Sequence, residues 1–185
     1  MLKDHDIMLA VRDGDVEKLG LLFEKHHKRL YNYFLLETKN QQASEDLVQD
    51  VFYRMLKYRH TYHSEGKLMT WMFKIARNAR IDYYREHSAQ PVPIEEGDDF
   101  VSSDPNPLEN LEQQSEIDLL RKAVDELSGD KREIIIMSRF NNMRYEEIGK
   151  VLGCTVGTVK VRVYRAIKEL TRNYFKLAGE TGHEM

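Results

Sequence analysis

Hydrophobic residues recur every three or four positions along most of the chain, which is the spacing of one buried helix face. Between residues 19 and 34 this spacing predicts a long helix, preceded by Gly14 as a stop signal and Asp15 as a start signal. A second helix is predicted from about Ser44, where acidic residues follow in the first turn. No segment shows sustained strand alternation, so the pattern predicts an all-α fold.

Two further apolar segments complete this pattern. A third helix is predicted from Thr70 to about Glu86, after a polar loop at 60–67, and its predicted buried stripe is Trp71, Met72, Ile75, Ala79 and Tyr83, with Ile81 on the flank. The continuous apolar run 134–137 is predicted to be a buried helix. Asp130 is its expected N-cap, with Glu133 three residues later.

The residues between these helical regions have a different composition. All four prolines fall within 91–107, and residues 89–118 contain no lysine or arginine and nine acids. Proline disrupts helices and like charges repel, so 89–118 is predicted to be a flexible acidic linker between small domains at 1–88 and 119–185. The net charges of the three segments are +2, −9 and +4. Two interpretations of the linker's acids remain: they compete with an anionic partner for the basic residues of the free protein, or they only keep the linker solvated.

Composition narrows the class of protein. With 41% hydrophobic and 32% charged residues, the chain is predicted to be globular rather than disordered, and it lacks the run of roughly 20 apolar residues that spans a membrane. Its single cysteine, Cys154, cannot form an internal disulfide, which favours a cytoplasmic location. No Cys/His cluster has metal-ligand spacing, so neither a metal nor another cofactor is predicted.

The C-terminal domain contains a motif for DNA binding. In YEEIGKVLGCTVGTVKVRVYRAIKEL, residues 145–170, a short helix is followed by Gly153 at a sharp turn and by a longer helix capped by Thr155. Gly149 is small where the two helices would cross. This is the helix-turn-helix arrangement, whose second helix enters the major groove. Its candidate DNA-binding residues are Thr155, Thr158, Lys160, Val161, Arg162, Tyr164 and Arg165.

This segment resembles the minus-thirty-five-recognising part of the extracytoplasmic-function sigma factors. Within the first domain, SEDLVQDVFYRML (44–56) is similar to that family's polymerase-binding helix, and TWMFKIARNARIDYYR (70–85) to its minus-ten-recognising helix. The resemblance implies a sigma-two-like and a sigma-four-like domain. It also implies binding to core RNA polymerase, to promoter DNA and to an anti-sigma factor, without a small-molecule substrate.

The resemblance assigns candidate residues in the first domain. In the 44–56 helix, the candidate polymerase contacts lie mainly on the polar face opposite the apolar stripe. The set is Asp46, Gln49, Asp50, Phe52 and Tyr53. Phe52 is assigned to either the core or the interface. Opened promoter DNA is held by basic and aromatic groups. The candidate minus-ten contacts are Tyr62, His63, Lys67, Lys74, Arg77, Asn78, Arg80, Asp82 and Arg85.

Two alternatives remain open at this point. A two-domain helix-turn-helix regulator would bind duplex DNA by itself, but its effector domain would be expected to show strands. A helical metal-dependent hydrolase would need ligands among His26, His27, His60 and His63. These histidines lack a paired-carboxylate motif such as H-E-x-x-H, so the protein is not expected to be an enzyme.

Overall fold

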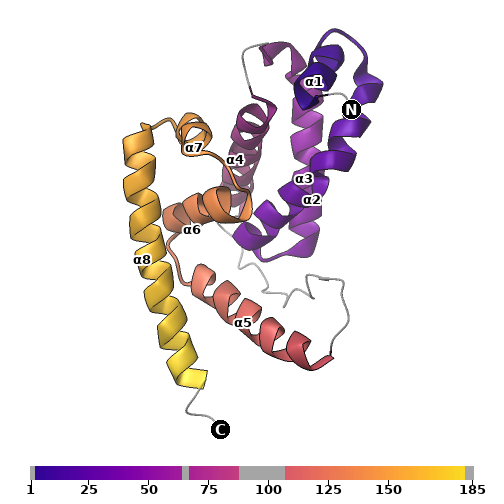
Figure 1. Cartoon of the computed structure of the whole chain (residues 1–185). Coiled ribbons are helices and arrows are strands. Elements are labelled where there is room, and N and C mark those ends of the chain that lie inside the picture. Colours follow the sequence, from indigo (N-terminus) through magenta and orange to yellow (C-terminus); the bar gives the residue numbers. More distant parts are fainter. Residues whose placement is uncertain (1–2, 64–66, 88–106, 182–185) are drawn as a thin grey trace.

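The computed structural model describes residues 3–63, 67–87 and 107–181, and all of its regular elements are helical. In the first domain, three long helices follow a short one, with two 3₁₀ turns between them. These elements are α1 (Asp4–Arg12), η1 (Val16–Lys18), α2 (Leu19–Thr38), α3 (Gln41–Lys57), η2 (Arg59–Thr61) and α4 (Leu68–His87). Helix α3 packs between α2 and α4 (Figure 1).

Within residues 107–181, the second domain has four α-helices and one π-helical turn. Its elements are α5 (Pro107–Asp125), α6 (Gly129–Ile135), the π-helical η3 (Ile136–Phe140), α7 (Tyr145–Leu152) and α8 (Val156–Thr181). The apolar run 134–137 is buried, as predicted, and packs against α8. No helix among the described residues is long and apolar enough to cross a membrane.

Several helix boundaries differ from the sequence-based prediction. Helix α3 begins at Gln41, three residues early, because the Asn40 side chain accepts a hydrogen bond of 2.8 Å from the Ala43 N–H. Helix α6 begins at Gly129 after Ser128, so Asp130 is not its N-cap. Glu133 is not a capping residue either, since its side chain is buried and bonded to the first domain.

The predicted linker is shorter at its C-terminal end. Residues 107–118 belong to α5, whose first residue is Pro107. Proline is well tolerated there because the first N–H groups of a helix have no intrahelical acceptor. The rest of the predicted linker, residues 89–106, lies outside the described residues, as do the five acids at 95–104 for which competition with an anionic partner was one interpretation.

The core of the first domain includes residues that the periodicity missed. Phe73 and Ala76 on α4 are fully buried, whereas Ile81 is 42% exposed. The buried face of α4 is therefore rotated from the predicted stripe. Trp71 is half-buried, and its ring contacts the Tyr62 ring edge to face at 5.3 Å between centroids. Its predicted position in the core is correct only in part.

The two helical domains expected from the sequence pack directly against each other. Helix α4 of the first domain lies against α7, and α2 contacts α6 and η3. Figure 1 shows α6 between α8 and the first domain. The buried apolar residues of both domains form one continuous cluster. The domains therefore adopt a closed arrangement in this structure, rather than being held only by a tether.

Candidate polymerase and nucleic-acid interfaces

The α7–α8 unit has the geometry of a helix-turn-helix. Gly153 ends α7 with φ 66°, a left-handed conformation that glycine adopts without strain. The Thr155 hydroxyl accepts a hydrogen bond of 3.2 Å from the Thr158 N–H and so caps α8. A Cβ atom on Gly149 would lie 2.7 Å from the carbonyl oxygen of Cys154. The predicted roles of Gly153 and Thr155 are confirmed, whereas the close approach at Gly149 is to the turn, and Val159 of α8 would lie 3.7 Å from its Cβ.

Replacing Gly149 by alanine should destabilise this unit. The obstructing atom is backbone, so the turn itself must move, and such overpacking typically costs about 1–3 kcal/mol. Urea unfolding measures the change. Gly157→Ala on α8 is the matched control, because the nearest atom to its new Cβ is 3.8 Å away. Alanine also favours a helix more than glycine does, so an unfolding free energy for Gly149→Ala equal to that of Gly157→Ala would show that the close approach does not destabilise the unit.

Helix α8 has a buried face and an exposed basic face. Val159, Val163 and Ala166 are buried against α6 and α7. The opposite face exposes Lys160, Arg162 and Arg165, together with Tyr164 at 69% and Val161 at 49% exposure. Thr158 is half-buried at its edge. This face has the charge and the length to lie along a DNA groove.

On α3, the candidate polymerase contacts lie in two environments. Asp46, Gln49 and Tyr53 are exposed on one face. Phe52 is 6% exposed, and its ring packs edge-on against Phe23 with centroids 5.0 Å apart. Phe52 is therefore a core residue in this structure, and its alternative assignment as a polymerase contact stays a prediction. The exposed face keeps an acid, an amide and a phenol available to a partner.

Asp50 and Asp82 share a cation. The Arg54 guanidinium bonds Asp50 on its own helix and Asp82 on α4, each at 2.8 Å. The hydrogen bond from Arg54 lowers the pKa of Asp82. Asp82 also pairs with Arg85 at 3.1 Å. This network ties α3 to α4, so these two candidate contact residues also help to hold the two helices together.

Tyr62 is not available to DNA in this structure. Its side chain is 1% exposed, and its hydroxyl lies 2.8 Å from His5 Nδ1. Burial raises the pKa of Tyr62 to about 12, so the hydroxyl stays protonated at neutral pH. In this structure Tyr62 is thus a core residue that joins α1 to the loop before α4, and its contact with DNA stays a prediction. His63, the next residue, is exposed.

The remaining minus-ten candidates divide between solvent and the second domain. Lys74, Asn78 and Arg85 are exposed on α4. The ammonium of Lys67 is bonded to Glu147 of α7 at 3.1 Å. Although burial opposes it, the Arg144 backbone N–H and Lys67 lower the pKa of Glu147.

Arg77 and Arg80 form a buried charge cluster with two acids. Arg77 Nε and Arg80 Nη2 each lie 3.0 Å from Oε1 of Glu133, which belongs to α6 and is 3% exposed. Arg80 also bonds Glu37 of α2, which is 4% exposed. Burial raises the pKa of Glu37, and the charge of Arg80 partly offsets that rise. Both arginines are therefore occupied by carboxylates in the closed arrangement.

Glu37 and Glu133 were not identified from the sequence as partners of α4. Each is an acid next to apolar residues: Glu37 follows Leu35-Leu36, and Glu133 precedes Ile134. A charged residue at a position that periodicity places inside is a signal for a buried ion pair. That signal was present, but it does not identify the partners.

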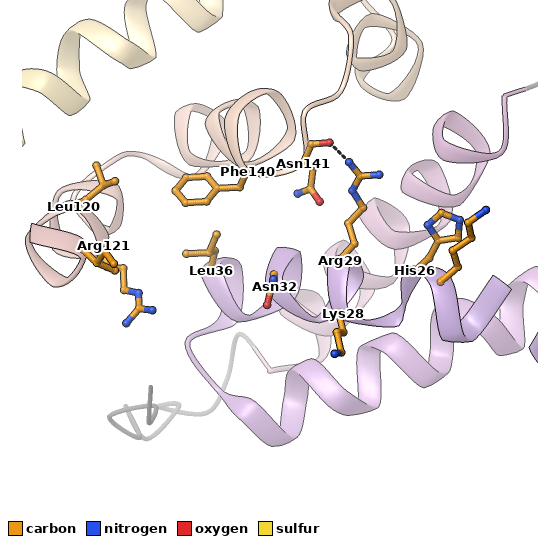
Figure 2. A pocket seen from close by; sticks show the side chains of 11 residues that line it. His26, Lys28, Arg29, Asn32, Leu36, Leu120, Arg121, Phe140 and Asn141 are labelled. Atoms are coloured by element: carbon orange, nitrogen blue, oxygen red, sulfur yellow. Dashed lines mark hydrogen bonds between the residues drawn. The ribbon is translucent and has the colours of Figure 1, made fainter. Parts of the chain in front are cut away.

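A cleft of about 730 Å³ lies between the two domains (Figure 2). On the first-domain side it is lined by α2, and Arg29 donates a hydrogen bond of 2.6 Å to the carbonyl oxygen of Asn141 across it. On the second-domain side the exposed apolar side chains are Ile117, Leu120 and Phe140. In the described part of the chain, no group of three or more His, Cys, Asp or Glu residues could hold a metal ion.

Comparisons with known sequences agree with both domains. Residues 22–90 match Sigma-70 region 2, and residues 117–170 match Sigma-70, region 4. The chain is 31% identical over 136 residues to the ECF RNA polymerase sigma factor EcfG of Rhodopseudomonas palustris (strain TIE-1), covering 71% of each chain. It is 29% identical over 155 residues to the ECF RNA polymerase sigma factor SigM of Bacillus subtilis (strain 168), covering 83% of this chain and 93% of SigM.

Solved structures show the same fold. CnrH, solved in complex with the cytosolic domain of CnrY, has a TM-score of 0.70 at 21% identity, over 91% of this chain and 95% of that one. The sigma factor RpoE from Bartonella quintana, solved with the anti-sigma factor NepR, has a TM-score of 0.65 at 23% identity, over 83% and 94%. With regions 2 and 4 in this order and its identity to EcfG, the chain belongs to the extracytoplasmic-function (ECF) sigma factors of RNA polymerase.

Proposed function

We propose that this protein directs core RNA polymerase to specific promoters and assists their opening, by binding alone and without a reaction of its own. The observation that carries the proposal is the helix-turn-helix with an exposed basic face, joined in one chain to a region-2 domain. Because promoters are transcribed in the cytoplasm, we place the protein there. A regulator with its own effector domain is disfavoured, since the first domain matches region 2.

In this proposal α8 recognises the minus-thirty-five element. Exposed Lys160, Arg162 and Arg165 supply charge for phosphates and donors for guanine, and Tyr164 adds a hydroxyl. The minus-ten element binds the loop before α4 and the polar face of α4, which carries Lys74, Arg77, Asn78 and Arg80 and is called the minus-ten face. Lys74 and Asn78 on that face are exposed already, whereas Arg77 Nε and Arg80 Nη2 are released from Glu133 only when the domains separate.

The α3 face is the proposed polymerase contact. Replacing Asp46 and Gln49 together by alanine should weaken binding to core polymerase by about tenfold or more, because the loss of two interface groups at about 0.7 kcal/mol or more each is at least about 1.4 kcal/mol in total. Both side chains are exposed, so helical content should stay unchanged. Pull-down of core polymerase over a concentration series measures the effect.

Glu24→Ala on α2 is the matched control, since it removes another exposed acid from the same domain. Binding of the double variant equal to that of the control would exclude the α3 face from the interface.

Run-off transcription with purified core polymerase tests the function itself. Adding the protein should produce transcripts from a subset of promoter fragments, and mapping their start sites should give paired upstream elements. If core polymerase with the protein starts no more transcripts than core polymerase alone, the proposed function is wrong. Binding of the protein alone to a duplex promoter, as tight as its binding with polymerase, would instead favour the regulator.

An anti-sigma factor is the further partner that we propose. RpoE of Bartonella quintana was solved with such a partner. The cleft between α2 and the second domain is a candidate contact surface, because it combines exposed Leu120 and Phe140 with the cations Lys28 and Arg121 (Figure 2). A helix with one apolar side and acidic flanks would match this lining.

A further inference from the structure

Five polar contacts between the domains have their charges arranged in the same direction. In each of them a cation of the first domain meets an oxygen acceptor of the second domain. The pairs are Arg29 with the Asn141 carbonyl at 2.6 Å, Lys39 with Asp125 at 3.0 Å, Lys67 with Glu147 at 3.1 Å, and Arg77 and Arg80 with Glu133 at 3.0 Å each. The second domain thus presents to α4 and its surroundings what a nucleic-acid backbone would present, namely a set of anionic and carbonyl oxygens.

We propose that Glu133 acts as an internal substitute for a DNA phosphate, keeping the minus-ten face of α4 closed in the free protein. The inference rests on the proposed function, because it takes that face to be a DNA site. Oε1 of Glu133 accepts from two guanidinium groups at once, as a phosphate oxygen can. While these bonds persist, Arg77 Nε and Arg80 Nη2 are not available to DNA, and the Arg80 side chain is only 11% exposed.

Burial makes this contact strong enough to matter. Glu133 is 3% exposed, so water and salt screen its attraction to the arginines far less than they would at the surface. The half-buried ion pair of Lys39 with Asp125 is more open to solvent, with side chains 39% and 33% exposed, and contributes much less. Because Glu133 is buried and bonds two arginines of α4 at once, we take it as the residue on which closure depends most.

The same cluster is incompletely satisfied, which allows it to open. Arg80 Nε and Glu37 Oε1 are buried and make no hydrogen bond to other described residues. Each buried polar atom without a partner lowers the stability of the arrangement that buries it. Separation of the domains would release Arg77 Nε and Arg80 Nη2 from Glu133 and offer them to DNA, while the bond of Arg80 to Glu37 lies within the first domain and remains. A protein that binds both domains in a separated position, as polymerase would, shifts this equilibrium towards the open form.

The test is Glu133→Gln, which keeps the shape of the side chain and removes its charge. The matched control is Glu169→Gln: it removes one acid from the same domain, but Glu169 bonds Lys131 within that domain. Small-angle X-ray scattering gives the radius of gyration. Fluorescence anisotropy with a labelled single-stranded 12-mer of mixed sequence gives the affinity for DNA.

We expect the radius of gyration of Glu133→Gln to exceed that of the wild type and its DNA affinity to rise about tenfold, because only the open fraction binds. Glu169→Gln should match the wild type in both. Equal affinity and equal size for Glu133→Gln and the wild type would overturn the proposal, as would an expanded variant that binds DNA no better. These outcomes are independent of run-off transcription, which tests the function.

Should Glu133→Gln unfold, Asp125→Asn is the second variant. It breaks the half-buried pair with Lys39 at the same domain boundary and leaves the buried cluster intact. We expect a smaller change in the same direction, about twofold in DNA affinity, given the low energy of pairs that are open to solvent. Unchanged affinity together with an unchanged radius in Asp125→Asn would then count against closure by this set of charges.

Discussion

Replacing Arg80 by alanine is expected to lower the free energy of unfolding by about 3–5 kcal/mol, the usual cost of removing one partner from a buried ion pair. The change leaves Glu37 without its cation, and Glu133 with Arg77 alone. Both acids are less than 5% exposed, so water cannot solvate them in place of the arginine. Urea unfolding at pH 7.5 measures the loss.

The loss should depend on pH. Burial already raises the pKa of Glu37, and Arg80 opposes that rise, so removing Arg80 should raise the pKa further. An acid with a raised pKa in the folded state destabilises the protein fully above that pKa. The penalty shrinks as pH falls towards the unfolded-state value, because the folded form then binds a proton more readily. We therefore expect the difference between variant and wild type to be smaller at pH 5 than at pH 7.5.

Arg85→Ala is the control for this experiment. Arg85 lies on the same helix, but its side chain is 74% exposed and bonds Asp82 at the surface, so the change should stay within about 1 kcal/mol. Should Arg80→Ala lose no more stability than Arg85→Ala, or the same amount at both pH values, the buried cluster would not stabilise the fold as argued.

The helix-turn-helix was predictable from the sequence because its determinants are local. Gly153 has a backbone conformation that its neighbours require, and Gly149 faces Cys154, only five residues away. Thr155 caps the helix that starts at the next residue. None of these features depends on the first domain. The spacing of apolar residues, which is also local, predicted most of the buried helix faces correctly. The errors were mainly in the first residues of helices, as in α3 and α6.

The closed arrangement could not be predicted, because it depends on contacts between distant positions. Arg77 and Arg80 share the polar side of a helical pattern with Lys74, and the sequence alone does not distinguish exposed cations from buried ones. Glu133 matched the spacing of a capping box, so a local role was assigned to a residue whose partners lie more than fifty positions away. Phe52 and Tyr62 are similar cases, since packing alone decided whether their rings were buried.

The second large effect is expected at the recognition face of α8. Arg162 and Arg165 are three residues apart and both exposed, so they lie on one side of the helix within reach of neighbouring base pairs. A bidentate contact to guanine contributes about 1–3 kcal/mol. Replacing both by alanine should therefore weaken promoter recognition by about 2–6 kcal/mol if the two contributions add.

The measurement uses polymerase reconstituted with each variant and a library of upstream elements. A single variant that loses a base contact should relax the preference at one promoter position. One that loses a phosphate contact should instead weaken all sequences evenly and reduce the salt dependence of binding. Arg172→Ala is the matched control, since Arg172 is exposed on the same helix seven residues beyond Arg165.

If the double variant selects the same elements as this control with the same affinity, the exposed face of α8 does not recognise DNA. The affinity of Arg172→Ala is informative too. If Arg162→Ala, Arg165→Ala and Arg172→Ala all lose the same affinity, the charge of α8 attracts DNA nonspecifically and the two arginines do not recognise its sequence.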